Sequence, residues 1–388
     1  MSKVIKIAGN QVASGQRRSI NIPVARLYTH TEMTIPVHVL RGKKDGPRLF
    51  VCAAIHGDEI VGVEIIRRLL KLKILQRLRG TLIAVPVVNV YGFINHTRYL
   101  PDRRDLNRFF PGSQKGSLTS RLANIFMEEI VANSTHGIDL HAGSHHRVNL
   151  PHIRACLDNP ETEKVAFAFG APVILNANLR DGSLRQSVEE NGIPMLLYEA
   201  GEALRFNEFV VRAGVKGILA VIRSIGMLTS RSVKTSRIQP MVAKSTSWVR
   251  APGSGILRTQ IPLGGKITVN QKIGEIADPP VAPGSHAVEL QRDPPQLAAL
   301  GDDRRLVAAL GRQDQPGLAQ WLSLRRLDPQ PVIAEGQIGR QFQSQPAESH
   351  PVQDPFLQDG QASRIHLSLP GAAIFLKDSP AQTRQQGP

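Results

Sequence analysis

The sequence predicts an α/β fold in which a mostly parallel or mixed sheet is covered by helices on both faces. Between about residues 47 and 225, continuous apolar runs of strand length alternate with helical patterns. Short apolar alternations broken by Gly and Pro follow, and they predict a small, truncated β-rich appendix at the C-terminal side. The 388 residues, of which 41% are hydrophobic, suffice for one large buried core and a smaller one.

The first elements of the large domain are a buried strand, a helix and a second strand. Residues 49–55 form an uninterrupted apolar run, and residues 60–79 place apolar side chains at helical spacing between basic ones. Gly80 favours the end of this helix. Residues 81–88 form another apolar run and predict the next strand.

The alternation continues after a long connection. Residues 89–116 are rich in Pro, Gly, Arg and Asp and predict a loop, whereas residues 118–132 predict a helix. Short strands are predicted over residues 137–141, 171–175 and 193–199, before a final helix over residues 210–227. Strands that alternate with helices in this way favour a mostly parallel sheet.

Composition divides the chain into three parts. We predict a large domain over residues 1–235, the start of a small β-rich domain over residues 236–280, and an atypical, poorly ordered tail over residues 281–388. The tail holds one lysine against thirteen in the part before it, and sixteen glutamines against eight. Strand patterning also stops near residue 280. We interpret this change as the product of a frameshift, which would leave the β-rich domain incomplete.

The net charge of +16 indicates an affinity for anions. Basic residues are scattered along the chain, aromatic residues make up only 5%, and no basic stretch is interleaved with aromatics as a stacking platform requires. We therefore expect a small anionic substrate and no nucleic-acid partner, and a basic nucleic-acid-binding protein is kept only as an alternative. A homo-oligomer is compatible with the sequence, which identifies no partner protein.

The sequence also carries information about the compartment. No apolar run approaches the roughly 20 residues that a membrane-spanning helix needs, and the first residues lack the apolar region of a signal peptide. The two cysteines, Cys52 and Cys156, are too few for a disulfide framework. We expect a protein of the reducing cytoplasm with no membrane partner.

Two histidines and a glutamate stand where predicted strands end. His56 and Glu59 directly follow the first strand, and His141 ends the strand over residues 137–141. Sites in open α/β sheets form at the carboxyl ends of strands, so these side chains can meet there. Two imidazoles, one carboxylate and an open position are typical of catalytic zinc.

Neighbouring residues include two alternative histidine ligands and one carboxylate that could hydrogen-bond to a ligand. His145 and His146 compete with His141 for the third position, although His141 stands directly at the strand end. Asp139 fits either an outer hydrogen-bond partner of the site or a strand-end cap.

Three residues of the long connection have side chains that bind anions. A guanidinium offers a planar fork of donors, so Arg98 and Arg108 together with Asn107 can clamp a carboxylate and stabilise a developing oxyanion. An ion-paired surface loop is the alternative interpretation of the same Arg- and Asp-rich segment.

An acidic residue ends the strand over residues 193–199. Glu199 lies where a general base can act on an attacking water. Glu202 is the alternative, and its position favours the start of a helix or the surface.

Taken together, these motifs resemble the succinylglutamate desuccinylase/aspartoacylase family of zinc-dependent deacylases. The matching pieces span most of residues 35–230: His-Gly-Asp-Glu at 56–59, Val-Asn at 88–89 with Gly-Phe at 92–93, Arg98 with Asp-Leu-Asn-Arg at 105–108, Asp-Leu-His at 139–141, and Tyr-Glu at 198–199. The resemblance implies the zinc carboxypeptidase-like fold and makes residues 1–235 a zinc-dependent deacylase catalytic domain.

The resemblance also implies a role for each matching residue. His56, Glu59 and His141 correspond to the ligands of one zinc ion per chain, and Glu199 to the general base that activates water. Arg98 corresponds to the arginine that stabilises the oxyanion, and Asn107 with Arg108 to the pair that holds a substrate carboxylate. Arg185 is a further candidate for substrate contact, which we leave open.

The resemblance implies a zinc-dependent hydrolase that cleaves the amide bond of a small N-acylated amino acid. A metallocarboxypeptidase-type peptidase is the alternative with the same fold. A second alternative is a homologue that binds metal or ligand but is inactivated by its altered C-terminus.

Overall fold

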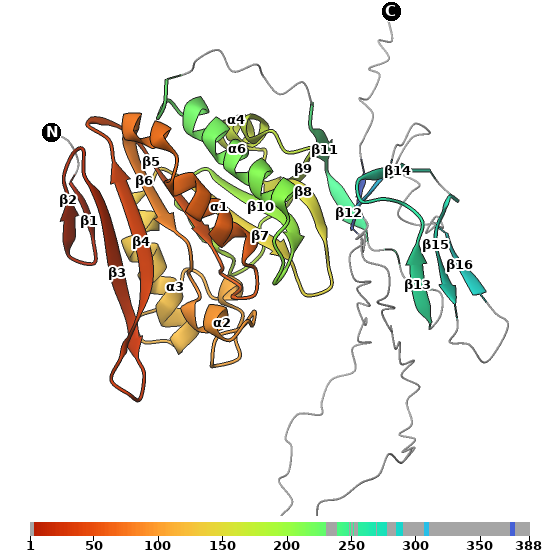
Figure 1. Ribbon diagram of the computed structural model, residues 1–388, viewed down its shortest axis with the longest axis horizontal. Coiled ribbons are helices and arrows are strands. Elements are labelled where there is room, and N and C mark those ends of the chain that lie inside the picture. Colours follow the sequence, from red (N-terminus) through yellow and green to blue (C-terminus); the bar gives the residue numbers. More distant parts are fainter. Residues whose placement is uncertain are drawn as a thin grey trace, which may run out of the picture.

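The computed structural model describes residues 4–229, 239–247, 249, 251, 255–268 and 270–277, together with the backbone of three short strands further along the chain. A nine-stranded mixed sheet dominates it (Figure 1), with the strand order β11-β9-β8-β10-β7-β5-β6-β4-β3. The strands are β3 (Arg17–Arg26), β4 (Glu32–Arg41), β5 (Lys44–Ala53), β6 (Arg79–Val85), β7 (His136–Gly143), β8 (Asn149–Ala155), β9 (Val173–Asn176), β10 (Met195–Glu202) and β11 (Met241–Ala243).

Helices cover both faces of this sheet. They are α1 (Val61–Leu70), α2 (Val90–Ile94), α3 (Leu118–Glu129), α4 (Pro160–Phe169), α5 (Leu184–Glu190) and α6 (Glu208–Ser224), with 3-10 turns at Lys73–Arg77, Leu106–Arg108 and Val131–Asn133. Alternate residues of β5 enter two cores: Leu49 and Val51 pack with α1, α4 and α6, whereas Phe50 and Cys52 pack with α3 and α5. This confirms the predicted α/β class and the strand buried on both faces.

The centre of the sheet is parallel and its flanks are mixed. β10, β7, β5 and β6 are adjacent and parallel, so their carboxyl ends lie at one edge. β8 runs antiparallel beside β10, and β4 and β3 add an antiparallel flank beyond β6. The sequence pattern did not predict β3, β4 or β8. Buried residues alternate with more exposed ones along β3 and β4, and polar residues interrupt β8, so none of the three forms an apolar run.

One predicted helix is shorter in the structure. The pattern over residues 60–79 becomes α1, which ends at Leu70, and a separate 3-10 turn over Lys73–Arg77. Leu72 between them is extended, with φ −73° and ψ 119°, and so interrupts the helical hydrogen bonds. The apolar spacing continues across the break because Leu75 is also buried against the same core.

A short hairpin, β1 (Ile5–Ile7) and β2 (Asn10–Val12), lies on the N-terminal side of the large domain.

A β-rich appendix follows the large domain, as expected. In the appendix, β12-β18-β17-β14 and β13-β15-β16 form two small sheets. Their strands are β12 (Ser245–Ser247), β13 (Ile256–Thr259), β14 (Gly265–Ile267), β15 (Lys272–Ala277), β16 (Ser285–Glu289), β17 (Leu306–Ala309) and β18 (Ala373–Leu376).

Two expectations concern parts of the chain that are only partly described. Apart from the backbone of β16, β17 and β18, the tail over residues 281–388 lies outside the described residues. The interpretation of that tail as a frameshift product concerns these same residues and stays a prediction. Within the described residues, no helix combines the length and the apolar character that crossing a membrane requires.

Candidate active site

The central strands bring the predicted ligand residues to one edge of the sheet. His56 follows the end of β5, Glu59 lies in the turn before α1, and His141 lies near the end of β7. All three side chains are buried, none more than 4% exposed. One ligand atom from each of them lies within 4.8 Å of the others, and this is the one three-residue group of metal-binding side chains found among the described residues.

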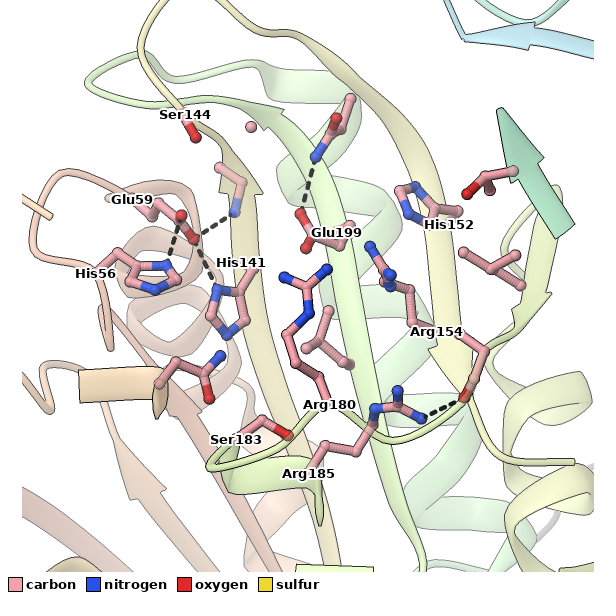
Figure 2. A pocket seen from close by; sticks show the side chains of 18 of the residues that line it. His56, Glu59, His141, Ser144, His152, Arg154, Arg180, Ser183, Arg185 and Glu199 are labelled. Atoms are coloured by element: carbon pink, nitrogen blue, oxygen red, sulfur yellow. Dashed lines mark hydrogen bonds and ion pairs between the residues drawn. The ribbon is translucent and has the colours of Figure 1, made fainter. Parts of the chain in front are cut away.

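Both imidazoles turn the same ring nitrogen towards Glu59, as Figure 2 shows. His56 Nδ1 lies 2.7 Å from Glu59 Oε1, and His141 Nδ1 lies 2.9 Å from Glu59 Oε2. The opposite nitrogens face carboxylates: His56 Nε2 lies 3.1 Å from Asp105 Oδ1, and His141 Nε2 lies 2.6 Å from Asp139 Oδ2.

This donor set fits a divalent metal of the zinc type. A histidine that ligates a metal through one nitrogen commonly donates the other N–H to a carboxylate, which fixes its tautomer and orientation. Asp105 and Asp139 are in position to accept those protons. Both Nδ1 lone pairs and the Glu59 carboxylate can then face one ion, which is the set that zinc prefers.

The electrostatics of the group favour positive charge at its centre. Burial alone would lower the pKa of His56, but Glu59 and Asp105 raise it above its ordinary value. Burial acts in the same way on His141, and Asp139 and Glu59 raise its pKa well above the ordinary value. Burial would raise the pKa of Glu59, but the two imidazoles hold it well below its usual range.

Gly57 holds the turn that carries His56 and Glu59 close to the neighbouring loop. A Cβ at this position would lie 1.9 Å from the backbone carbon of Gly92 in α2, so the two backbones can approach only without a side chain. We expect Gly57→Ala to destabilise the fold by about 1–3 kcal/mol through overpacking, measured by denaturant unfolding. Gly226→Ala is the control because a Cβ there meets nothing within 4 Å, leaving only the strain of its positive φ. Equal losses in the two variants would contradict this role of Gly57.

Glu199 of β10 lies beside the histidine group, next to His141 of the neighbouring strand β7. It pairs in register with His141, because β10 and β7 are adjacent and parallel. Asn149 of β8 donates its Nδ2–H to Glu199 Oε2 at 2.8 Å. Burial raises the pKa of Glu199, His141 lowers it, and Glu59 raises it, with a net upward shift. A raised carboxyl pKa is typical of a group that takes and returns a proton.

Arg98 connects the histidine group to the loop before α3. Its guanidinium lies 3.4 Å from Glu59 Oε1, and it donates to Asp105 Oδ2 at 2.9 and 3.2 Å. The side chain is 26% exposed and lines the pocket. Arg98 is therefore held beside the histidine group, with part of its side chain open to the pocket.

Asn107 and Arg108 line the same pocket from the 3-10 turn at Leu106–Arg108, further along the same connection. Asn107 Oδ1 accepts a hydrogen bond from the backbone N–H of Leu184 at 2.9 Å, so the group that Asn107 has left to offer is its Nδ2 donor. Arg108 is exposed and donates to the backbone carbonyl of Asn107. Both residues can thus present N–H groups to an anion.

The structure separates the alternatives that the sequence left open. His145 and His146 are exposed and lie edge to face with their ring centroids 3.8 Å apart, outside the group formed by His56, Glu59 and His141. Glu202 accepts from the backbone N–H of His146 and does not line the pocket. Arg185 lines the pocket but is 5% exposed and donates to the carbonyls of Ala177 and Asn178.

Glu189, close to Arg185, gives a prediction for stability. Burial raises the pKa of Glu189 to about 7, and Arg185, 3.9 Å away, only partly offsets this. A carboxyl that stays protonated in the folded state binds more protons than the unfolded chain, so stability falls as the pH rises from about 4.5 to about 7. We expect Glu189→Gln to flatten this part of the stability profile, measured by urea unfolding at several pH values. Parallel profiles for the variant and the wild type would contradict the prediction.

Some residues at the site were not recognised from the sequence. Asp105 supports both His56 and Arg98, but within an Arg- and Asp-rich loop it resembled a surface ion-pair residue. Asn149 and Arg154 come from β8, which the apolar pattern missed. Arg180 lies in the loop between β9 and α5. In the sequence of β8 the polar residues Asn149, His152 and Arg154 interrupt the apolar ones, so no apolar run marked this strand.

The mixed sheet, the pocket at the strand ends and the buried His-Glu-His group define an α/β catalytic domain. Residues 45–225 match the model of the succinylglutamate desuccinylase/aspartoacylase catalytic domain. The resemblance that the motifs indicated is thereby confirmed.

Similar proteins support the same assignment. The chain is 28% identical over 265 residues to N-alpha-acetyl-L-2,4-diaminobutyric acid deacetylase of Halomonas elongata, covering 63% of this chain and 74% of that protein. A succinylglutamate desuccinylase/aspartoacylase structure from Rhodobacter sphaeroides is 25% identical with a TM-score of 0.62, covering 71% of this chain and 87% of that one. The product-bound ectoine utilization protein EutE (DoeB) from Ruegeria pomeroyi shares the fold, with 21% identity, a TM-score of 0.63 and the same two coverages.

Proposed function

We propose that the chain is a zinc-dependent deacylase that hydrolyses the amide bond of a small N-acylated amino acid. The observation that carries the proposal is the buried group of His56, Glu59 and His141, directly beside Glu199 in a pocket that also holds Asn107 and Arg108. The deacetylase of Halomonas elongata acts, by its name, on an N-acetylated amino acid. A pocket of about 1040 Å³ accommodates a substrate of that size.

Each residue of the site has a role in this proposal. His56, Glu59 and His141 would hold one zinc ion, which when bound polarises the amide carbonyl and lowers the pKa of a water molecule. Glu199 takes the proton of the attacking water and passes it to the leaving amine nitrogen. Arg98 donates hydrogen bonds to the oxyanion as it develops. The products are a carboxylate and a free amine.

Asn107 and Arg108 orient the substrate in this proposal. The Asn107 Nδ2 donor and the Arg108 guanidinium would bind a carboxylate of the amino acid. Held at this end, the amide bond lies between the histidine group and Glu199. We further propose that residues 1–235 form the catalytic domain, that residues 236–280 begin the β-rich domain, and that the enzyme works in the cytoplasm.

Amine release from a panel of substrates tests the proposal. The panel combines N-acetyl, N-succinyl and longer N-acyl amino acids with short peptides, and zinc is supplied at one equivalent per chain. Hydrolysis of one N-acyl class supports the proposal and identifies the acyl group. Cleavage of the peptides alone would point to a carboxypeptidase-type reaction instead, and zinc binding without any turnover would point to an inactive homologue.

Asp139 gives a prediction about metal affinity. It accepts from His141 Nε2 at 2.6 Å and from Cys52 Sγ at 3.3 Å, and so orients the imidazole. We expect Asp139→Asn to weaken zinc binding about 10- to 100-fold, measured by competition with a chelator. Asp158→Asn, on the exposed surface, is the matched control and leaves the affinity unchanged. An unchanged affinity in Asp139→Asn would show that His141 is oriented without its carboxylate partner.

A further inference from the structure

Within the part of the chain that the structure describes, the Glu199 side chain has one hydrogen-bond donor, Asn149 of β8. The Asn149 Nδ2–H reaches Glu199 Oε2 at 2.8 Å, and Figure 2 draws this contact as a dashed line to Glu199. Asn149 is half-buried and lines the pocket. No hydrogen bond from the described residues reaches Glu199 Oε1, so this oxygen is the one left to accept a proton.

An irregularity in the strand pairing places Asn149 on the face of Glu199. β8 runs antiparallel to β10, and His152 pairs with Glu199. A regular ladder would then pair Leu150 with Gly201, but the register shifts and Asn149 takes that place. Because side chains alternate between the two faces of a strand, the shift of one residue moves Asn149 to the face that carries Glu199.

The other polar side chains of β8 near Glu199 do not supply this hydrogen bond. The His152 Nδ1–H donates to the backbone carbonyl of Leu150 at 2.8 Å, and burial lowers the pKa of His152 to about 4. A neutral imidazole has a single N–H, so His152 has no second proton to offer Glu199. Arg154 acts on Glu199 only at a distance, since no hydrogen bond or ion pair joins these two described residues.

We propose that Asn149 is a positioning residue that assigns the proton of the attacking water to a single oxygen of Glu199. The Asn149 N–H occupies Oε2, so Oε1 accepts the proton. Oε1 then gives this proton to the leaving nitrogen, which keeps the electron pair of the broken carbon–nitrogen bond, and the carboxylate is restored. A charge-assisted hydrogen bond also holds the plane of the carboxylate, whose terminal torsion is otherwise broad. The inference rests on the proposed function.

Asn149→Ala in the zinc-loaded full chain tests the inference. We expect kcat for an N-acyl amino acid to fall about 10- to 100-fold, as for the loss of a hydrogen bond to a charged group, while KM and zinc affinity stay within about twofold. Asn191→Ala is the matched control. It removes the same kind of donor, which there reaches the backbone carbonyl of Ser187 outside the pocket, and should leave kcat unchanged.

A double variant separates positioning from a structural role. If Asn149 acts through Glu199, then Asn149→Ala should cause no further loss of rate in the Glu199→Gln protein, because the proton acceptor is already gone. A structural contribution would multiply the two losses instead. Single-turnover amine release measures the rate in both backgrounds. An unchanged kcat in Asn149→Ala, or the same fold-loss with and without Glu199, would overturn the inference.

The side-chain amide of Asn149 gives a readout that needs no turnover. In protein with isotope-labelled asparagine, one of the Nδ2 proton signals should be shifted downfield by the carboxylate. Asn149→Ala assigns the signal, Glu199→Gln should reduce the shift, and Glu202→Gln should leave it in place. A signal that does not respond to Glu199→Gln would overturn the inference.

Turnover by the wild type separates this inference from the proposed function. Hydrolysis of an N-acyl amino acid at the full rate in Asn149→Ala would overturn the positioning role alone. Failure of the wild type to hydrolyse any N-acyl amino acid would contradict the deacylase function, and the positioning role with it.

Discussion

Glu199→Gln is expected to lower turnover of an N-acyl amino acid about 10²- to 10⁴-fold while zinc stays bound at one equivalent. The glutamine keeps the shape of the side chain and its place opposite His141 on the neighbouring strand, but it cannot accept the proton of the attacking water. The measurement is single-turnover amine release combined with metal analysis of the same sample.

Glu202→Gln is the matched control for this variant. It carries the same substitution three residues away, on a side chain that pairs with Arg205 and the backbone of His146 and does not line the pocket. We expect its activity to remain within a few-fold of the wild type. If Glu199→Gln kept full activity, or if Glu202→Gln lost as much, Glu199 would not be the general base.

Replacement of His141 by alanine is expected to abolish both zinc binding and turnover. One of three buried donors is lost, and Glu59 is left with a single imidazole partner. In the wild type, a zinc concentration about 100-fold above its dissociation constant should stabilise the fold by about 2.7 kcal/mol. The variant should show none of this gain in a thermal unfolding experiment with and without zinc.

His145→Ala is the control for the loss of a histidine. His145 is exposed and contacts His146 edge to face, outside the group formed by His56, Glu59 and His141. Its variant should keep the full stabilisation by zinc and the full activity. Loss of zinc binding in His145→Ala, with retention in His141→Ala, would reverse the ligand assignment.

The parallel centre of the fold was predictable because its strands are buried on both faces. The apolar run of β5 and the shorter ones of β7 and β10 revealed three neighbouring strands, and the polar residues at their ends indicated the site. The strands β3 and β4 alternate in burial and polar residues interrupt β8, so these three strands left no apolar run to detect. Consequently Arg154 and Asn149, which β8 carries into the pocket, were missed.

The hydrogen-bond partners of the site residues also could not be predicted from the sequence. Asp105 lies 49 residues from His56 and within 3.1 Å of it, a contact that only the folded loop creates. Arg185 matched the expectation of a charged pocket residue, but its donors are occupied by the carbonyls of Ala177 and Asn178. Residue type and spacing predicted which side chains approach the site, whereas the partner of each donor depended on the loops.

A zinc titration of metal-free protein during hydrolysis of an N-acyl amino acid tests the central claim most directly. The account predicts that activity rises linearly with zinc up to one equivalent per chain and then stays constant, and that a chelator reverses the rise. Activity that is independent of bound metal, or one bound equivalent of zinc with no hydrolysis of any N-acyl amino acid, would contradict it.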